Sequence, residues 1–393
     1  MAGDKMSVKI SVLALGGAGC RIIREFAGDP ASANFNILAM DSDLESLKNS
    51  GVPEDRWIQA GKLLRSGRGC GGDVIAGQQV VANERKLLTS MLADTHLLIV
   101  TGGLGGGLAT GGLSVVLGVA AKLRIASAVV ATLPFDMEGF QRRRLADDKL
   151  KNDILPVADA VIALPNDLLF STLEAETPMS EAFQLADKEM AKTLFAVASI
   201  LGGGNLFSAD FAAFTGVLKR RHTLCALGSG VADYQDDAPE KAMQAMLMSP
   251  LLGGPETLDT ADALAFSLLG GPELSMGTAR SALELCARQL DPKNEKNILL
   301  GASTSEDFAG KLQLSVLAVR YLDPLDLKSP RKNSSRRIQE SGVVDEPGTQ
   351  MDLPNLIVED KGIMENTLPV MLNGEDLDIP AFKRRGIVID AGK

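Results

Sequence analysis

Short apolar runs alternate with helical patterns along the first part of the chain. The apolar runs predict buried strands over residues 8–15, 35–40, 97–100, 128–132 and 160–164. Segments with helical spacing of apolar residues separate these runs, among them residues 21–27 and 113–123. This alternation is typical of a doubly wound α/β fold, in which a parallel sheet binds ligands at the carboxyl ends of its strands. We therefore expect a functional site at that edge of the sheet.

The second half of the chain has its own alternation. An apolar-rich helix is predicted over residues 190–201, and further strands are predicted over residues 224–227, 263–269, 297–302 and 312–321, with helices over 239–247 and 276–289. The segment is long enough to form a compact α/β domain. The predicted organisation is a first domain over residues 1–189, a central helix and loop over 190–222, and a smaller α/β domain over 223–322.

Composition changes after Tyr321. Pro, Ser, Asn and clustered charges follow without a sustained period, which predicts a disordered linker over residues 323–374. A flexible linker of this length has an r.m.s. reach of roughly 40 Å. Apolar residues return within residues 375–393, between acidic and basic flanks. We expect a docking peptide there, and a tail that binds nothing is the alternative.

Three glycine-rich loops lie near the ends of predicted strands, at residues 16–19, 67–72 and 102–112. Glycine lets a phosphate approach the backbone without meeting a Cβ, and a helix that starts after such a loop points N–H groups at an anion. No Lys follows the third loop, so it is not a Walker A motif. A single loop of this kind could be a flexible turn, but three together predict a nucleotide-binding site.

Composition narrows the class of protein. The 393 residues carry 40 Lys and Arg against 50 Asp and Glu, a formal net charge of −10, which argues against a nucleic-acid binder. The four cysteines form no CxxC pair and the two histidines are far apart, so no metal site or disulfide framework is expected. There is no signal-peptide pattern and no long uninterrupted apolar stretch. We expect a cytoplasmic protein.

The motifs resemble those of one family, FtsZ, the tubulin-like GTPase of bacterial cell division. The third glycine loop, with Thr110-Gly111, resembles the family's GGGTGTG motif, and residues 134–142 resemble its PFxFEGxxR element. Further matches occur in the family's order at Pro165-Asn166-Asp167, Phe183, Asp210-Phe211-Ala212, Gly228-Ser229-Gly230, Ser249-Pro250-Leu251-Leu252 and Asp378-Ile379-Pro380-Ala381-Phe382. The likeness covers residues 8–322 and the tail, and implies a tubulin/FtsZ-like fold.

The resemblance also implies a site for GTP or GDP with Mg²⁺. Glu138 would accept hydrogen bonds from the ribose, Arg142 would clamp a terminal phosphate, and Asn166 would pair with guanine. The implied nucleotide contacts are Gly16, Gly17, Ala18, Arg21, Gly71, Gly72, Gly105, Gly106, Gly107, Ala109, Thr110, Gly111, Glu138, Arg142, Asn166, Phe183 and Asp187. Asp210 and Arg142 are the implied catalytic residues, with Asp210 acting on the nucleotide of a neighbouring subunit.

Plainer interpretations of three of these residues stay open. Glu138 could be a solvated turn carboxylate, and Phe183 could be a core side chain. Arg142 precedes Arg143 and Arg144, which could together form a basic helix face.

Several positions depart from the family pattern. Leu108 stands where the family has a Thr whose hydroxyl lies near the terminal phosphate, and Ala109 replaces a Gly and would resist a positive φ. Asp41 adds a carboxylate near the phosphates. The remaining departures are Arg21 for Asn, Ser208 for Asn, Ala213 for the second Asp of the catalytic loop, and Lys188 for the guanine-reading Asp, with Asp187 one residue earlier. Guanine recognition would then depend on Asp187, and hydrolysis should be slower by about 10²-fold.

The expected function is a GTP-hydrolysing protein that polymerises head to tail into filaments of a mid-cell division ring. Its tail, over residues 376–385, would bind a membrane-tethering division protein. The alternative is a divergent relative with weak or no GTPase activity that acts as a structural or regulatory filament protein. An enzyme that uses a dinucleotide at residues 16–19 is a weaker possibility, because it would leave two glycine loops without a role.

Overall fold

The structure is a computed structural model that describes residues 8–62, 69–170, 176–202, 216, 222–288, 297–322, 371–372 and 375–376. It forms two units, Met1–Arg331 and Lys332–Lys393. The second unit contributes one short antiparallel pair, β11 (Met371–Leu372) with β12 (Glu375–Asp376). The rest of the predicted linker and tail lies outside the described residues, so the linker and the docking peptide stay predictions.

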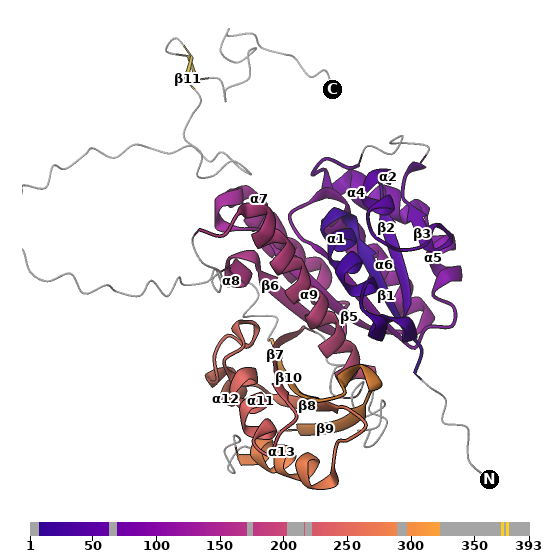
Figure 1. Cartoon of the computed structure of the whole chain (residues 1–393). Helices are drawn as coiled ribbons and strands as arrows, with labels where there is room; N and C mark the ends of the chain where they lie inside the picture. The colour runs from indigo at the N-terminus through magenta and orange to yellow at the C-terminus, as the bar shows by residue number, and fades with distance from the viewer. Residues whose placement is uncertain are drawn as a thin grey trace, which may run out of the picture. The chain divides into compact units, whose positions relative to one another are not determined.

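One ten-stranded sheet runs through the first unit in the order β3-β2-β1-β4-β5-β6-β7-β10-β8-β9 (Figure 1). Strands β1 to β6 are parallel, whereas β10 pairs antiparallel with β7 and β8. The strands are β1 (Ile10–Leu15), β2 (Asn36–Asp41), β3 (Trp57–Gln59), β4 (Leu97–Gly103), β5 (Ala126–Leu133), β6 (Ala160–Pro165), β7 (Thr223–Asp233), β8 (Ala263–Gly270), β9 (Asn297–Thr304) and β10 (Lys311–Tyr321).

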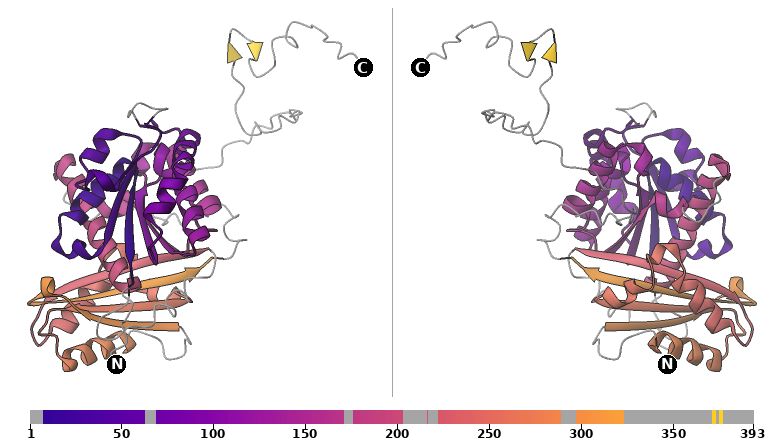
Figure 2. Two further views of the ribbon diagram at one scale, coloured as in Figure 1. Left: turned by 90° about the vertical axis from the view of Figure 1, so that its right-hand side faces the viewer. Right: turned by 90° about the vertical axis from the view of Figure 1, so that its left-hand side faces the viewer.

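Helices cover both faces of the parallel half of the sheet (Figure 2). The helices are α1 (Gly16–Ala27), α2 (Leu44–Lys48), α4 (Val74–Asn83), α5 (Arg85–Met91), α6 (Gly107–Leu123), α7 (Phe140–Lys149), α8 (Asn166–Phe170), α9 (Met179–Gly202), α11 (Ala238–Leu247), α12 (Glu256–Thr260) and α13 (Met276–Arg288). The predicted doubly wound α/β fold is confirmed. None of the helices in the described ranges has the length and apolar character needed to span a bilayer.

The alternation of side chains along β1 separates the two cores of this half. Val12 and Ala14 pack with α1 and α9, whereas Leu13 and Leu15 pack with α4, α5 and α6. Because both faces are buried, the strand reads as a continuous apolar run. A third core lies between α11, α13 and one face of β8 and β10.

Helix α9 packs against both halves of the sheet. Its buried residues share one core with β1 and β4 and also with Leu317 and Val319 of β10. The predicted central helix is therefore present, and it begins eleven residues earlier than the sequence indicated, at Met179 instead of residue 190. The domain boundaries that the sequence suggested stay predictions.

Candidate functional site

Two helices begin at the carboxyl ends of the neighbouring strands β1 and β4. Helix α1 starts at Gly16, directly after Leu15, and α6 starts at Gly107. Neither N-cap residue, Leu15 or Gly106, accepts a hydrogen bond through its side chain. The first amides of both helices are therefore oriented as helix N-termini are when they bind an anion.

The first and third glycine loops touch at these helix starts. Gly16 has a φ of +77°, and a Cβ there would lie 3.5 Å from both the Cβ and the amide nitrogen of Ala109. Gly102 and Gly103 at the end of β4 approach the same region, since a Cβ on Gly103 would lie 2.9 Å from the Cβ of Ala18. Glycine is needed at Gly16 because of its positive φ, and at Gly102 and Gly103 because of the close approach of neighbouring atoms.

The second glycine loop packs against the third. A Cβ on Gly107 would lie 2.9 Å from the amide nitrogen of Asp73 and 3.0 Å from the Cβ of Cys70. The loop glycines Gly71 and Gly72 have φ values of +57° and +89°, and a Cβ on either would face open space. The structure thus brings the described residues of all three predicted loops, 16–19, 69–72 and 102–112, together at one edge of the sheet.

Thr110, Gly105 and Gly111 of the third loop make structural contacts. Thr110 is buried, and its Oγ1 accepts a hydrogen bond of 2.8 Å from the amide of Gly105, whose φ is +97°. A Cβ on Gly111 would lie only 2.0 Å from the carbonyl oxygen of Val74 in α4. These residues hold the loop and its helix in place.

Leu108 and Ala109 are core residues of the first turn of α6. Each is 5% exposed, and both belong to the hydrophobic cluster on the α4–α6 side of the sheet. Ala109 is not among the residues of the described chain that have a positive φ. The expectation that Ala109 would resist its backbone conformation is therefore wrong, because α6 begins before this residue and gives it an ordinary helical geometry.

Asp41 lies beside the first loop with a buried carboxylate. Its Oδ1 accepts hydrogen bonds from the amides of Ser42 at 2.7 Å and Asp43 at 3.2 Å. Burial raises the pKa of Asp41, and these hydrogen bonds oppose that rise. Its Oδ2 would lie 3.8 Å from a Cβ on Gly17. The extra carboxylate predicted near the phosphate loops is therefore present at that place.

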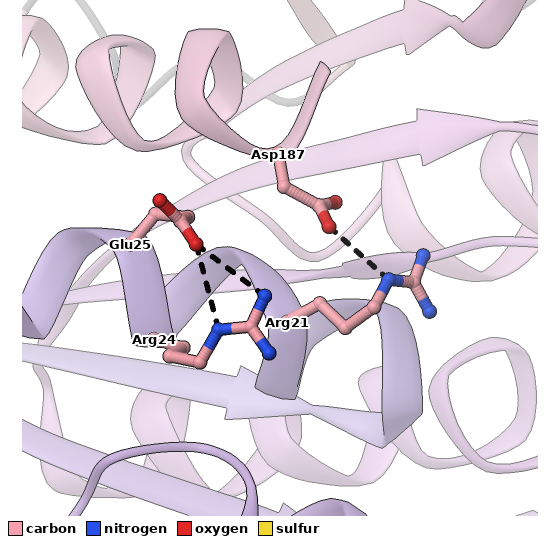
Figure 3. A network of polar contacts seen from close by, with 4 residues as sticks. All are labelled: Arg21, Arg24, Glu25 and Asp187. Atoms are coloured by element: carbon pink, nitrogen blue, oxygen red, sulfur yellow. Dashed lines mark hydrogen bonds and ion pairs between the residues drawn. The ribbon is translucent and has the colours of Figure 1, made fainter. Parts of the chain in front are cut away.

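The site extends to a partly buried ion pair between α1 and α9 (Figure 3). Arg21 Nε donates to Asp187 Oδ2 over 3.2 Å, and the Asp187 side chain is 9% exposed against 50% for Arg21. Burial raises the pKa of Asp187, whereas the Arg21 guanidinium opposes the rise. Lys188, the residue on which the guanine-reading position falls by counting, is exposed.

Phe183 lies one helical turn before Asp187 on α9. It is 37% exposed, and its ring meets that of Phe135 edge to face, with centroids 6.0 Å apart and planes at 85°. This exposure excludes the interpretation of Phe183 as a core side chain. Asn166 begins α8 at the carboxyl end of β6.

Glu138 and Arg142 bind each other at the end of β5. Arg142 Nη1 donates to Glu138 Oε2 over 2.6 Å, and Glu138 Oε1 accepts from the amide of Phe135 over 3.0 Å. Arg143 instead pairs with Asp136. Each arginine thus has its own acidic partner, and Glu138 is a paired carboxylate rather than a solvated one.

Asp210, Ser208 and Ala213 lie outside the described residues. Sequence reasoning missed the Arg21–Asp187 pair and the contact of Phe183 with the Phe135 ring, because no local pattern connects these residues. The four-residue spacing of Phe183 and Asp187 indicated only that these two share one helix face. Within the described residues no group of three His, Cys, Asp or Glu is placed to hold a metal ion.

The chain is similar in sequence to known proteins of one family. Residues 9–174 match the GTPase domain of the Tubulin/FtsZ family. Cell division protein FtsZ 1 of Pyrococcus abyssi is 30% identical over 291 residues, which cover 74% of this chain and 75% of that protein. The corresponding protein of Pyrococcus furiosus is 28% identical over 343 residues, covering 85% and 89%.

Solved structures show the same likeness. An empty FtsZ dimer of M. jannaschii has a TM-score of 0.71 at 25% identity, covering 87% of this chain and 96% of that one. A GTPγS-bound protofilament of CetZ2 from Haloferax volcanii has a TM-score of 0.64 at 20% identity, covering 81% and 96%, and shares the fold.

Proposed function

Because the chain belongs to the Tubulin/FtsZ family, we propose that it binds GTP in its three glycine loops and assembles head to tail into filaments. The observation that carries this proposal is the convergence of the loops around Gly16, Gly107 and Ala109. Two helix N-termini and an open loop at Gly71 and Gly72 supply backbone donors for the phosphates without a lysine. A cation such as Mg²⁺ would take its ligands mainly from phosphate oxygens and water.

Filament formation follows from a site shared between subunits. Asp210 of one subunit would act on the nucleotide of the next, and a heterologous contact that does not close produces a filament. Two solved relatives support this, since one is a dimer of FtsZ and the other a protofilament of CetZ2. In the cell the filament would contribute to the division machinery, joined to the membrane through a partner of the tail.

A filament with little or no turnover is the second candidate. The observation that favours it is Leu108, which is buried in the core and offers no hydroxyl to the site. The loss of the second aspartate at Ala213 points the same way. Both candidates require self-association, and they differ in whether the filament hydrolyses GTP.

Nucleotide binding is tested by calorimetric titration of the full chain with GTP and GDP in the presence of Mg²⁺. We expect micromolar or tighter affinity. Gly71→Asp and Gly71→Asn provide a matched pair, because both residues tolerate a left-handed backbone and differ only in charge. If phosphates bind this loop, the Asp variant should bind GTP at least about tenfold more weakly than the Asn variant. Equal affinities, or no heat with either nucleotide, would refute the proposed site.

A further inference from the structure

Arg21 and Asp187 occupy one corner of the site together with an exposed aromatic ring. Phe183 and Asp187 are four residues apart on α9 and so share a face of that helix. Arg21 belongs to α1, whose first turn forms part of the first glycine loop, and about 7.5 Å of helix rise separates it from Gly16. The corner therefore combines a stacking surface, a donor and an acceptor close to the proposed phosphate site.

The pair combines a hydrogen-bond donor, Arg21, with an acceptor, Asp187. Arginine has five N–H donors, of which the Nε–H is engaged with Asp187. Among the described residues, Arg21 is the hydrogen-bond partner recorded for the Asp187 carboxylate, and the Arg21 side chain is half exposed. In Figure 3 the Arg21 guanidinium lies beside the Asp187 carboxylate, joined to it by the bond between Nε and Oδ2, which leaves the Nη donors of Arg21 and the Oδ1 acceptor of Asp187 for a ligand.

We propose that Arg21 is a specificity-determining residue, which joins Asp187 in a donor–acceptor pair that selects guanine over adenine. This inference rests on the proposed nucleotide-binding function. Guanine presents the O6 acceptor beside the N1–H and N2–H₂ donors, which matches an arginine donor beside a carboxylate acceptor. Adenine presents the N6–H₂ donor beside the N1 acceptor, so Arg21 would face a donor and Asp187 an acceptor.

The ion pair also explains how a buried carboxylate stays ready to accept a hydrogen bond. Burial raises the pKa of Asp187, while Arg21 and, more weakly, Arg24 oppose the rise and Glu25 adds to it. An ionised carboxylate accepts from guanine N1–H, whereas a protonated one carries a hydrogen that competes for that position. Lys188, which is exposed beside Asp187, offers no acceptor for guanine.

Arg24 gives a matched control for Arg21. It lies on the same helix three residues further on and pairs with Glu25 of its own helix over 3.4 Å (Figure 3). Arg21→Met and Arg24→Met therefore change charge and side-chain length in the same way, and only the first removes the contact with Asp187. Arg21→Lys keeps the charge but not the planar set of donors. Melting temperatures of all variants report whether they are folded.

The experiment measures the affinities of the full-length variants for GDP and ADP, which keep hydrolysis out of the measurement. We expect the wild type to prefer GDP by at least about 100-fold. Arg21→Met should reduce this preference by about tenfold or more through weaker GDP binding, with ADP affinity little changed. Arg24→Met should keep the wild-type preference, and Arg21→Lys should lie between the two. Combining Arg21→Met with Asp187→Asn should cost little more than Asp187→Asn does, since the two side chains act as a unit.

The pH dependence of GDP binding separates a direct role from a merely structural one. Without Arg21, burial raises the pKa of Asp187 with less opposition, so GDP affinity should begin to fall at a higher pH on acidification than in the wild type. Equal GDP preference and equal pH profiles in Arg21→Met and Arg24→Met would overturn the inference while nucleotide binding stands. A wild type that binds neither nucleotide would instead refute the proposed function on which the inference depends.

Discussion

Asp41 and Asp187 show two ways of keeping a carboxylate in a nearly buried place. Asp41 is held by the amides of Ser42 and Asp43, whereas Asp187 is held by a guanidinium. Burial raises the pKa of both side chains. Because Asp41 also borders the first glycine loop, its charge should affect stability and nucleotide affinity together.

Replacing Asp41 by Asn tests this directly. The raised pKa means that the folded protein holds the proton to a higher pH than the unfolded chain, so the free energy of unfolding falls as the pH rises from about 4 through the raised value. Asn keeps the Oδ1 acceptor and removes the charge. Asp41→Asn should therefore gain stability relative to the wild type between pH 4 and pH 7, as measured by urea unfolding, and should bind GTP more tightly at pH 7.

Asp43 provides the comparison for this substitution. Its side chain caps α2 by accepting a hydrogen bond from the amide of Glu45. Asp43→Ala should cost about 1 kcal/mol of stability at pH 7. A relative stability of Asp41→Asn that declines from pH 4 to pH 7 would contradict the assignment of a buried, costly charge.

At the scale of elements, the third glycine loop, residues 102–112, has two structural roles. Its first part forms the start of α6 beside the other loops, and its last part lets α4 and α6 touch backbone to backbone. A Cβ on Gly77 of α4 would lie 2.1 Å from the carbonyl oxygen of Gly107, and one on Gly111 would lie 2.0 Å from that of Val74. The packing of two helices therefore sets the position of the proposed phosphate loop.

Gly111 and Gly118 of α6 allow a matched test of this packing. Gly111→Ala would force a methyl group into the backbone of α4 and should destabilise the protein by about 1–3 kcal/mol. Gly118→Ala has open space around it and should stabilise the helix by about 0.5–1 kcal/mol. The denaturation midpoints of the two variants should therefore move in opposite directions. Equal midpoints would show that the helices can separate freely.

An element could be predicted from the sequence where a run of neighbouring residues carries its pattern. Strands β1, β4, β5 and β6 are buried on both faces, so their apolar runs were visible in the sequence. Strand β3 has three residues at the sheet edge, too few for such a run, and it was not predicted. Helix α6 begins six residues before the predicted helix because packing against α4 overrides the low helix propensity of glycine.

The residues of the candidate site were likewise predictable only where they form a contiguous motif. Glycine loops are contiguous motifs, and the structure brings all three together as expected. Arg21 and Asp187 lie 166 residues apart, so no local pattern connects them. The strain expected at Ala109 was wrong, since the start of α6 could not be located from propensity.

At the scale of the whole first unit, α9 connects the proposed guanine-binding residues Phe183 and Asp187 with the second half of the sheet. Phe183 and Asp187 lie in its first turns, and Ser199 near its end is hydrogen-bonded to Ser267 of β8 over 3.2 Å. The same helix packs into one core with strands of both halves. A single element therefore joins the nucleotide region to the C-terminal strands.

The tail belongs to the second unit and is predicted to act separately from the first. Truncation before residue 375 removes Ile379 and Phe382, which the sequence places in a docking peptide. Nucleotide binding and assembly in solution should change little, while recruitment to the division site should be lost, as seen by fluorescence microscopy of the tagged protein. Mid-cell rings formed by the truncated protein without a full-length copy would show that the tail is not the anchor.

The proposed nucleotide site is completed by a second copy of the chain. Measuring phosphate release from GTP at rising protein concentration tests this sharing most directly. The turnover per molecule should rise with concentration, disappear in Asp210→Ala, and increase in Ala213→Asp. No release at any concentration, together with GTP-dependent assembly, would support the filament without turnover. A turnover per molecule that is independent of protein concentration, and unchanged in Asp210→Ala, would contradict the shared site.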